Sequence, residues 1–239
     1  MPGLLRKLED ARDRGKVKWA VDELVGAGVL GTPKAMMTVL KMMGGKGHYN
    51  EAIELHRQMA APNAFTFTAV IKACDNAGDL GKALEVFAEM EAAGVTHDVA
   101  TFNTLIEACG AHGVPDDVAF VFQTAVEHGH YAAAVVSREH ARVGTARNSI
   151  DLHDCSKQAA LEAVRHKLAN LTARDLELGL GIITGKGLHS AGGPVVPAAV
   201  AELLSTDCYA SLAAALDPAN HGVTFIDPAR LAAWHAARQ

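Results

Sequence analysis

The feature that most constrains the fold of this chain is an apolar pattern that recurs three times between residues 33 and 133. The segments AIELHRQM, ALEVFAEM and VAFVFQTA begin at Ala52, Ala83 and Val118. They start 31 and 35 residues apart, and each follows another repeated apolar segment, MMTVLKMM, FTAVIKAC or FNTLIEAC. A period of this size is typical of stacked supersecondary units, so the sequence predicts a repeat architecture.

Each repeat is predicted to contain two short helices. In the second repeat, apolar residues recur at helical spacing from Val70 to Cys74, Gly78 interrupts the pattern, and Gly94 ends a second apolar stretch. One helix pair cannot bury its apolar face alone, so neighbouring pairs must stack. We therefore expect an α-helical solenoid over residues 1–133. Its repeats are expected at about residues 33–63, 64–98 and 99–133.

Composition excludes several other classes of protein. Apolar residues make up 49% of the 239 residues and charged residues 21%, which is typical of a chain that folds around a core. No apolar run reaches the roughly 20 residues that a membrane helix needs, so we expect no membrane partner. The four cysteines include no CxxC pair, which argues against a disulfide scaffold or a structural zinc site. The N-terminal segment mixes acidic and basic residues without an apolar centre, so we expect no signal or transit peptide in it.

The C-terminal part of the chain follows a different pattern. The polar stretch at residues 134–147 predicts a linker, after which strand and helix patterns alternate. We expect strands in NSIDLHD, LELGLGIITGKG, SLAAAL and GVTFI, the first two paired in parallel. We expect helices after the N-cap Ser156, from Pro194 to Leu204, and from Asp227 to Trp234. This order predicts a small α/β domain over residues 148–239.

The second and third repeats, which contain FTFTAVIKACDNAGDLGKALEVFAEMEAAGVTHD and VATFNTLIEACGAHG, resemble the pentatricopeptide repeat family. The resemblance is carried by T-F-N/T-x-L/V-I near the start, A-G at the turn between helices, A-L-x-x-F-x-x-M and a G-V-x-x-D end. It implies stacked helix pairs that bind single-stranded RNA, one base per repeat, in a chloroplast or mitochondrion. The solenoid could also hold a protein partner.

In this family the fifth and last residues of a repeat select the base. The second repeat carries Thr68 and Asp98 there, and the resemblance implies that this pair selects guanine. The third repeat carries Asn103, which implies a pyrimidine, but Ala133 cannot complete a polar pair. The alternative is that these residues only begin and end helices, because Thr and Asp are common helix caps.

The C-terminal domain resembles the Smr (small MutS-related) family, especially the Smr domains fused behind pentatricopeptide repeats. Two motifs carry the resemblance, Ile150-Asp151-Leu152-His153 and Thr184-Gly185-Lys186-Gly187, and the segments GKGLHS, DPANHG and AAW agree with it. The resemblance implies a domain that binds nucleic acid and that can act as an endonuclease. Lys186 departs from many of the fused plant forms, which carry an aromatic residue there.

Asp151 and His153 are the candidate catalytic residues. Two positions apart on a predicted strand, their side chains leave the same face. A carboxylate can orient an imidazole that then acts as a general base on a water or a ribose hydroxyl. The alternative is a solvated strand edge without a chemical role.

A glycine loop after the second strand is the candidate phosphate-binding site. Gly185 and Gly187 can expose backbone N–H groups to an anion, and Lys186 and His189 add positive charge beside Thr184. The alternative is a tight turn that needs glycine for a positive φ. The spacing differs from that of an NTPase phosphate loop, so nucleotide hydrolysis is excluded.

Charge and cofactor requirements complete the prediction. The net charge of −5 excludes a globally basic nucleic-acid binder, and the 10 acidic and 2 basic side chains of residues 64–133 argue mildly against tight RNA binding. The sequence predicts no definite cofactor, and a divalent cation (Mg²⁺ or Mn²⁺) could assist cleavage.

We predict an RNA-binding protein of organellar RNA processing whose Smr domain binds or cleaves nucleic acid. The alternative is a non-catalytic RNA-binding or protein-interaction adaptor.

Overall fold

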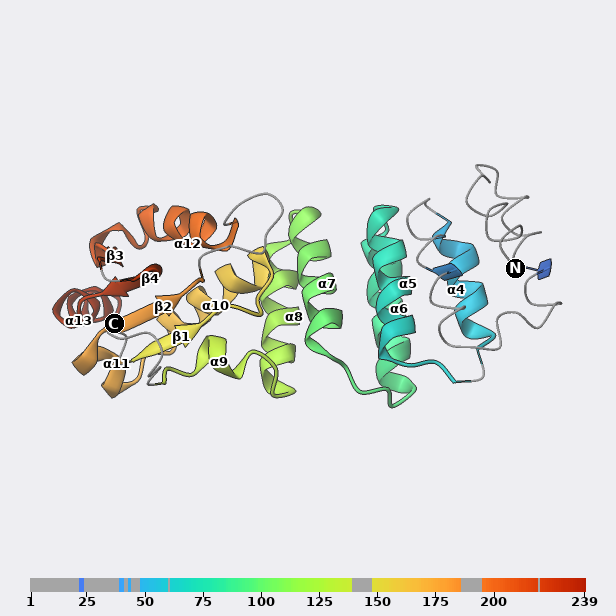
Figure 1. Ribbon diagram of the computed structural model, residues 1–239, viewed down its shortest axis with the longest axis horizontal. Helices are drawn as coiled ribbons and strands as arrows, with labels where there is room; N and C mark the ends of the chain where they lie inside the picture. The colour runs from blue at the N-terminus through green and yellow to red at the C-terminus, as the bar shows by residue number, and fades with distance from the viewer. Residues whose placement is uncertain are drawn as a thin grey trace. The chain divides into compact units, whose positions relative to one another are not determined.

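The computed structural model describes residues 22–23, 39–40, 43, 48–59, 61–138, 148–185, 195–218 and 220–239 (Figure 1). The chain divides into two compact units, Met1–Pro115 and Asp116–Gln239. The described elements of the first unit are helices, and the second unit contains a four-stranded sheet with helices. The predicted order of a helical repeat region followed by an α/β region is therefore confirmed. Within the described ranges, no helix is both long and apolar enough to cross a membrane.

The helices of the first unit follow the predicted repeats. They are α4 (Tyr49–Arg57), α5 (Ala64–Asn76), α6 (Leu80–Ala92) and α7 (Val99–Ala111). Polar N-caps start α5, α6 and α7, because the side chains of Asn63, Asp79 and Asp98 each accept a hydrogen bond from the backbone N–H three residues later. Gly78 and Gly94, with φ of 77° and 65°, follow α5 and α6 and allow the chain to turn.

The apolar pattern of the repeats forms the core of the first unit. Helix α5 packs against α4, α6 and α7, and its Val70 and Ile71 side chains are fully buried. Cys74 and Cys109 occupy equivalent repeat positions, and both are free thiols without exposed surface. Burial raises the pKa of the Cys74 thiol to about 11, so it stays protonated and packs as a small apolar residue.

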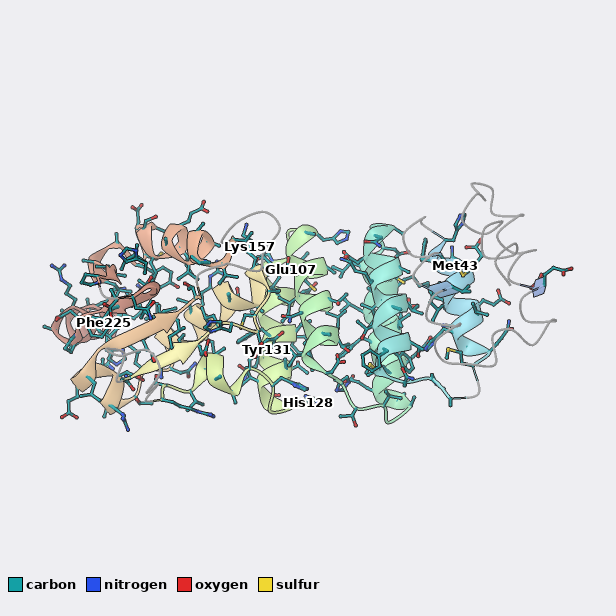
Figure 2. All side chains as sticks on the ribbon, viewed as in Figure 1. Met43, Glu107, His128, Tyr131, Lys157 and Phe225 are labelled. Atoms are coloured by element: carbon teal, nitrogen blue, oxygen red, sulfur yellow. The ribbon has the colours of Figure 1, made fainter. Side chains whose placement is uncertain are left out.

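The second unit begins with two helices and continues into the sheet. In chain order its elements are α8 (Pro115–Glu127), α9 (Ala132–Val135), β1 (Ser149–Asp151), α10 (Lys157–Ala169), α11 (Ala173–Leu178), β2 (Leu180–Ile183), α12 (Val195–Ser205), η3 (Ala210–Leu212), β3 (Ala215–Asp217), β4 (Asn220–Ile226) and α13 (Pro228–Ala236). Phe122 of α8 stacks on Tyr131, which Figure 2 labels, with ring centroids 5.1 Å apart. Phe122 also meets His166 of α10 at 6.0 Å. Helix α8, the second helix of the third repeat, therefore packs with the α/β region.

The sheet has the strand order β1-β2-β4-β3. Strands β1 and β2 run parallel with Asp151 opposite Ile183, and β4 runs antiparallel to β2 and β3. The parallel pairing agrees with the sequence prediction, and it brings the carboxyl ends of β1 and β2 to the same edge of the sheet. Helices α10 and α12 pack against each other, as do α11 and α13.

The structure differs from the sequence prediction at three places in this unit. Strand β1 ends at Asp151, and His153 lies in the turn that follows. The segment LEL belongs to α11 instead of the second strand, because Thr172 and Asp175 form a capping box that starts a helix, which ends at Gly179 with φ of 78°. In SLAAAL, a short 3₁₀ helix forms first and the strand begins only near the end of the segment.

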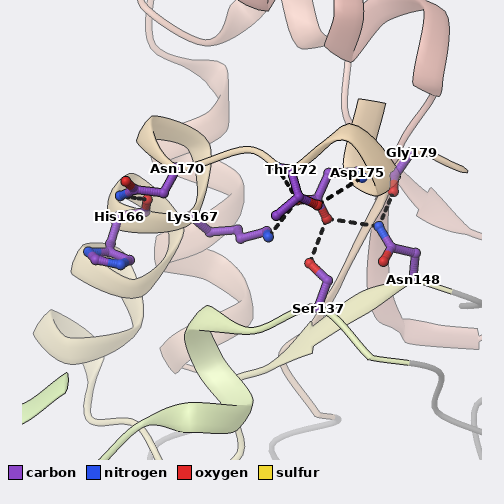
Figure 3. A network of polar contacts seen from close by, with 8 residues as sticks. All are labelled: Ser137, Asn148, His166, Lys167, Asn170, Thr172, Asp175 and Gly179. Atoms are coloured by element: carbon purple, nitrogen blue, oxygen red, sulfur yellow. Dashed lines mark hydrogen bonds and ion pairs between the residues drawn. The ribbon is translucent and has the colours of Figure 1, made fainter. Parts of the chain in front are cut away.

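A buried ion pair joins several segments of the second unit (Figure 3). Asp175 and Lys167 are 0% and 2% exposed, and Lys167 Nζ lies 2.6 Å from Asp175 Oδ2. The carboxylate also accepts hydrogen bonds from Ser137 Oγ (2.6 Å), Asn148 Nδ2 (2.9 Å), and the N–H and hydroxyl of Thr172 (both 2.7 Å). Burial alone would raise the pKa of the Asp175 carboxyl, but these donors, Lys167 foremost, hold it well below its usual range.

The same network attaches part of the predicted linker to the α/β region. Ser137 precedes residues 139–147 in the chain and Asn148 follows them. The side chains of both donate hydrogen bonds to Asp175. Arg138 and Ser149 exchange backbone hydrogen bonds of 2.9 and 3.0 Å in an isolated antiparallel bridge. Residues up to Arg138 are therefore part of the second unit, and the rest of the predicted linker lies outside the described residues.

Candidate nucleic-acid interface

Thr68 and Asp98, the predicted base-selecting pair, are linked by a third side chain. Asp98 caps α7, where its Oδ1 accepts hydrogen bonds from the backbone N–H of Thr101 (2.7 Å) and from the Thr101 hydroxyl (2.8 Å). The Thr68 hydroxyl on α5 lies 2.7 Å from Thr101 Oγ1 and 2.8 Å from Ala64 O. Thr68 and Asp98 are half-buried, whereas Thr101 has no exposed surface. The three side chains form a continuous polar chain between neighbouring repeats.

The sequence analysis missed Thr101, although its signal is present in the sequence. A Thr three residues after an Asp or Asn is a helix N-cap pattern, and it occurs at Asn63 and Thr66 as well as at Asp98 and Thr101. Asp98 therefore does cap a helix, as the alternative interpretation held. Within the described residues, the hydrogen bonds to its carboxylate end on Oδ1.

The third repeat provides a less complete pair. Asn103 is half-buried on α7, and Ala133 lies exposed on α9. The Ala133 methyl group can neither donate nor accept a hydrogen bond. Asn103 is therefore the polar member of the predicted pair at this repeat.

Acidic residues of the repeats gather on the second helix of each pair. Helices α6 and α8 carry most of them, namely Glu85, Glu89, Glu91, Asp116, Asp117 and Glu127. The first helices α5 and α7 carry only Asp75 and Glu107, and Asp75 is paired with Lys72 at 2.6 Å. The helices that carry Thr68 and Asn103 therefore bear little of the net negative charge.

The two candidate catalytic residues are in direct contact. Asp151 Oδ1 accepts a hydrogen bond from the backbone N–H of His153 (3.0 Å) and contacts His153 Nδ1. The contact crosses a turn after the last residue of β1, and the intervening Leu152 is buried. The side chains of His153 and Asp151 are 57% and 27% exposed, so a ligand can reach the imidazole.

The glycine loop meets this pair through Gly185. This residue follows β2 with φ of 70°, and a Cβ placed on it would lie only 3.0 Å from His153 Nε2. Glycine supplies both the positive φ and the close approach. Thr184 is buried and its N–H donates to Gly222 O of β4 at 3.0 Å, which fixes the start of the loop on the sheet. Asp151, His153 and Gly185 thus lie together at the shared carboxyl edge of β1 and β2.

The remaining members of the predicted loop, Lys186, Gly187 and His189, lie outside the described residues. Mg²⁺ and Mn²⁺ prefer several oxygen ligands, and the Asp151 carboxylate at this edge already contacts the His153 imidazole. In the described part of the chain, no group of three or more His, Cys, Asp or Glu side chains is placed to hold a metal ion.

Comparison with known proteins identifies the repeats. A model of the PPR repeat family matches residues 62–111, and a model of the PPR repeat matches residues 100–130. A mitochondrial pentatricopeptide repeat-containing protein of Arabidopsis thaliana is 26% identical over 119 residues, which are 47% of this chain and 16% of the relative. A second such protein of the same plant is 36% identical over 78 residues (33% and 15%), and a chloroplastic one is 29% identical over 96 residues (38% and 11%).

These matches agree with the helical architecture. The matched stretch spans less than a fifth of each of the three relatives. Both family matches lie within residues 62–130, where α5, α6, α7 and α8 form, and end before the sheet begins. The repeated apolar pattern, the capped helix pairs and the family matches together identify residues 62–130 as pentatricopeptide repeats.

Proposed function

We propose that the chain binds single-stranded RNA in a chloroplast or mitochondrion and that the repeat at residues 64–98 selects a guanine. Proteins of this family bind organellar RNA, and similar proteins carry mitochondrial and chloroplastic names. The observation that carries the proposal is the polar chain from Thr68 through Thr101 to Asp98. It holds two half-buried polar side chains, from the start and the end of this repeat, close enough to contact one base edge.

The distribution of charge supports this proposal. RNA affinity depends strongly on phosphate contacts, so a uniformly acidic repeat would repel its ligand. Most of the acidic residues lie on the second helices, and the first helices carry the base-selecting positions. The sequence argument against tight binding therefore weakens for the surface formed by α5 and α7.

A substitution at Asp98 tests base selection. A carboxylate only accepts hydrogen bonds, whereas an amide also donates, so Asp98→Asn should weaken the preference for guanine and favour adenine at one position. Binding would be measured by fluorescence anisotropy at fixed salt, with four single-stranded RNAs that differ at that position. Asp79→Asn is the matched control, because Asp79 caps α6 with its bond to the Lys82 N–H (3.0 Å) and is not a base-selecting residue. An unchanged preference in Asp98→Asn would show that Asp98 is only a cap.

We further propose that residues 148–239 are a Smr domain that contacts the RNA backbone and cleaves it. When His153 Nδ1 donates its proton to Asp151, Nε2 is left as an acceptor beside Gly185. Nε2 would then take a proton from a ribose 2′-hydroxyl or a water that attacks phosphorus, while the P–O bond to the next nucleotide breaks and its leaving oxygen takes a proton from solvent. The general-base role is worth roughly 10²–10⁴-fold in rate. Loop N–H groups and Lys186 would hold the phosphate.

Cleavage of labelled RNA by the full chain tests the second proposal. Asp151→Ala should abolish cleavage with little loss of binding, because it removes the group that orients the imidazole. Lys186→Ala should weaken both. Glu202→Ala, which removes an exposed carboxylate on α12, is the control. If the folded protein binds RNA without cleaving any of it, with or without Mg²⁺ or Mn²⁺, the adaptor function takes the place of the nuclease.

A further inference from the structure

We infer that Thr101 is a positioning residue that sets the base preference of the preceding repeat. The inference rests on the proposed function, because it assumes that Thr68 and Asp98 contact a base. Thr101 itself is fully buried and cannot reach a ligand. It acts through its hydroxyl, which lies 2.8 Å from Asp98 Oδ1 and 2.7 Å from Thr68 Oγ1.

The direction of the hydrogen bonds follows from counting protons. A carboxylate has none to give, so the proton between Thr101 and Asp98 must belong to the Thr101 hydroxyl. The Thr101 oxygen can then only accept from Thr68 across the 2.7 Å contact. The other oxygen near the Thr68 hydroxyl is the carbonyl of Ala64 at 2.8 Å, which is also an acceptor. The Thr68 proton is therefore directed into the protein.

This direction determines what the pair offers to a base. Both side chains are half-buried and can then only accept from a base, Thr68 through its oxygen lone pairs and Asp98 through its carboxylate. Guanine has two adjacent donors, N1–H and N2–H₂, on its Watson–Crick edge, whereas each other base places an acceptor beside its donor there. Two adjacent acceptors therefore favour guanine. The Thr101 hydroxyl keeps Thr68 and Asp98 in this acceptor role.

The preceding repeat boundary shows that this arrangement is not a general result of helix capping. Thr66 occupies the position equivalent to Thr101 and is also buried, at 1% exposed. Its hydroxyl donates to the backbone carbonyl of Asn63 (2.9 Å) and contacts His56 Nε2 (3.2 Å). The Asn63 side chain accepts from the Thr66 backbone N–H, at 3.2 Å. Thr66 is thus an internal control with the same residue type, burial and cap position.

The experiment compares Thr101→Val with Thr66→Val in the full chain. Valine keeps the shape of threonine and removes the hydroxyl, so both variants lose one hydrogen-bonding group of a cap. Dissociation constants would be measured against the same four RNAs at fixed salt, and thermal unfolding by circular dichroism would check that both variants fold. Thr101→Ser restores the hydroxyl, and Thr101→Ala replaces Thr101→Val if the latter does not fold.

Thr101→Val should lower the preference for guanine over the other bases roughly tenfold, which is the effect of about one charge-assisted hydrogen bond. Thr66→Val and Thr101→Ser should leave that preference unchanged. A guanine preference that survives in Thr101→Val overturns this inference and leaves the proposed function intact. An equal loss in Thr66→Val also overturns it, because a cap effect would then explain both. Absence of RNA binding by the unsubstituted chain overturns the proposed function and the inference with it.

Discussion

The repeat unit and the α/β unit bury their polar side chains in different ways. In the repeats, the buried polar contacts described above are made by threonine hydroxyl groups near helix starts, such as Thr66 with the His56 imidazole and Thr101 with the Asp98 carboxylate. In the α/β unit, Lys167 and Asp175 have almost no exposed surface, and their ion pair lies at the centre of a hydrogen-bond network. The first arrangement joins one helix to the next, whereas the second joins segments far apart in the sequence.

This difference shows where each unit is vulnerable. Losing a neutral hydrogen bond in a repeat removes about 1 kcal/mol and affects two adjacent helices. Losing one member of the α/β network leaves a buried charge without its partner, which costs several times more. The α/β unit should therefore respond to single substitutions more sharply than the repeats do.

The largest effect is expected for Lys167→Met, which leaves the buried Asp175 carboxylate without its cation. The free energy of unfolding of the second unit should fall by about 3–5 kcal/mol. Urea unfolding of the fragment 116–239 and of the full chain, followed by circular dichroism, measures the change. The double variant Lys167→Met with Asp175→Leu should recover much of the loss, because it removes both charges. A loss below 1 kcal/mol in the single variant would contradict the comparison.

A pair of glycine substitutions comes next. Gly179 in the α/β unit and Gly78 in the repeats have nearly the same φ, 78° and 77°. A Cβ on Gly179 would lie 2.5 Å from Ile226 O, whereas the nearest atom to a Cβ on Gly78 is 4.0 Å away on His112. Alanine should therefore cost about 1–2 kcal/mol at Gly78 from backbone strain alone and clearly more at Gly179. Equal decreases in the thermal midpoints of the two variants would contradict this. They would show that the positive φ alone, and not the nearby Ile226 carbonyl, determines both losses of stability.

The α/β unit should also be sensitive to acid. Because the pKa of Asp175 is lower in the folded unit than in the unfolded chain, its ionised form contributes stability above the unfolded pKa of about 4. That contribution, about 2–3 kcal/mol, should disappear as the pH falls from about 4 towards the folded pKa. Urea unfolding of the fragment 116–239 at pH 7, 5 and 3 measures it. In Asp175→Asn, this part of the pH dependence should be missing.

A truncation tests where the α/β unit begins. The fragment 148–239 lacks Ser137, which donates to Asp175, and Arg138, which pairs with Ser149. It also lacks the ring contact between Phe122 and His166. We expect both fragments to fold, with 148–239 about 2 kcal/mol less stable than 116–239. Equal stability would place the boundary at the predicted residue 148.

The smallest effect concerns the cysteines of the two regions. Burial raises the pKa of the Cys74 thiol to about 11 and that of Cys155 to about 12, whereas Cys208 is exposed. At pH 8 a thiol reagent such as DTNB should react quickly with Cys208 alone, because only a thiolate reacts. The other three thiols should react after unfolding. Rapid reaction of Cys74 would indicate that the repeats open more readily than their packing suggests.

The sequence predicted the parts of the molecule that depend on neighbouring residues. The repeat helices follow from apolar spacing and from caps such as Asp79 and Asp98, which act within three residues. Helix α11 was missed because a six-residue helix has little periodicity and depends on the capping box at Thr172. Ser137, which donates a hydrogen bond to Asp175, lies 38 residues away in the sequence. No local sequence pattern predicts a contact over that separation.

Only the part of the candidate site that depends on neighbouring residues was predicted from the sequence. Asp151 and His153 were expected to share a strand face, and they do meet, but across a turn because β1 ends earlier than the pattern suggested. The contact of Gly185 with His153 depends on the register of β1 on β2, which only the assembled sheet defines. Thr101 was not predicted because its sequence pattern indicates only a helix cap. Nothing in that pattern indicates its hydrogen bond to Thr68 of the preceding repeat.

The bridge between Arg138 and Ser149 has a consequence for engineering the chain. Because the two residues are hydrogen-bonded to each other, they hold the two ends of the segment between them side by side. The entropic cost of closing an inserted flexible segment rises only by about 0.6 kcal/mol for each doubling of its length. Residues 139–147 are therefore the position at which an epitope, a fluorescent reporter or a crosslinking cassette can be inserted while the sheet keeps its anchors on both sides.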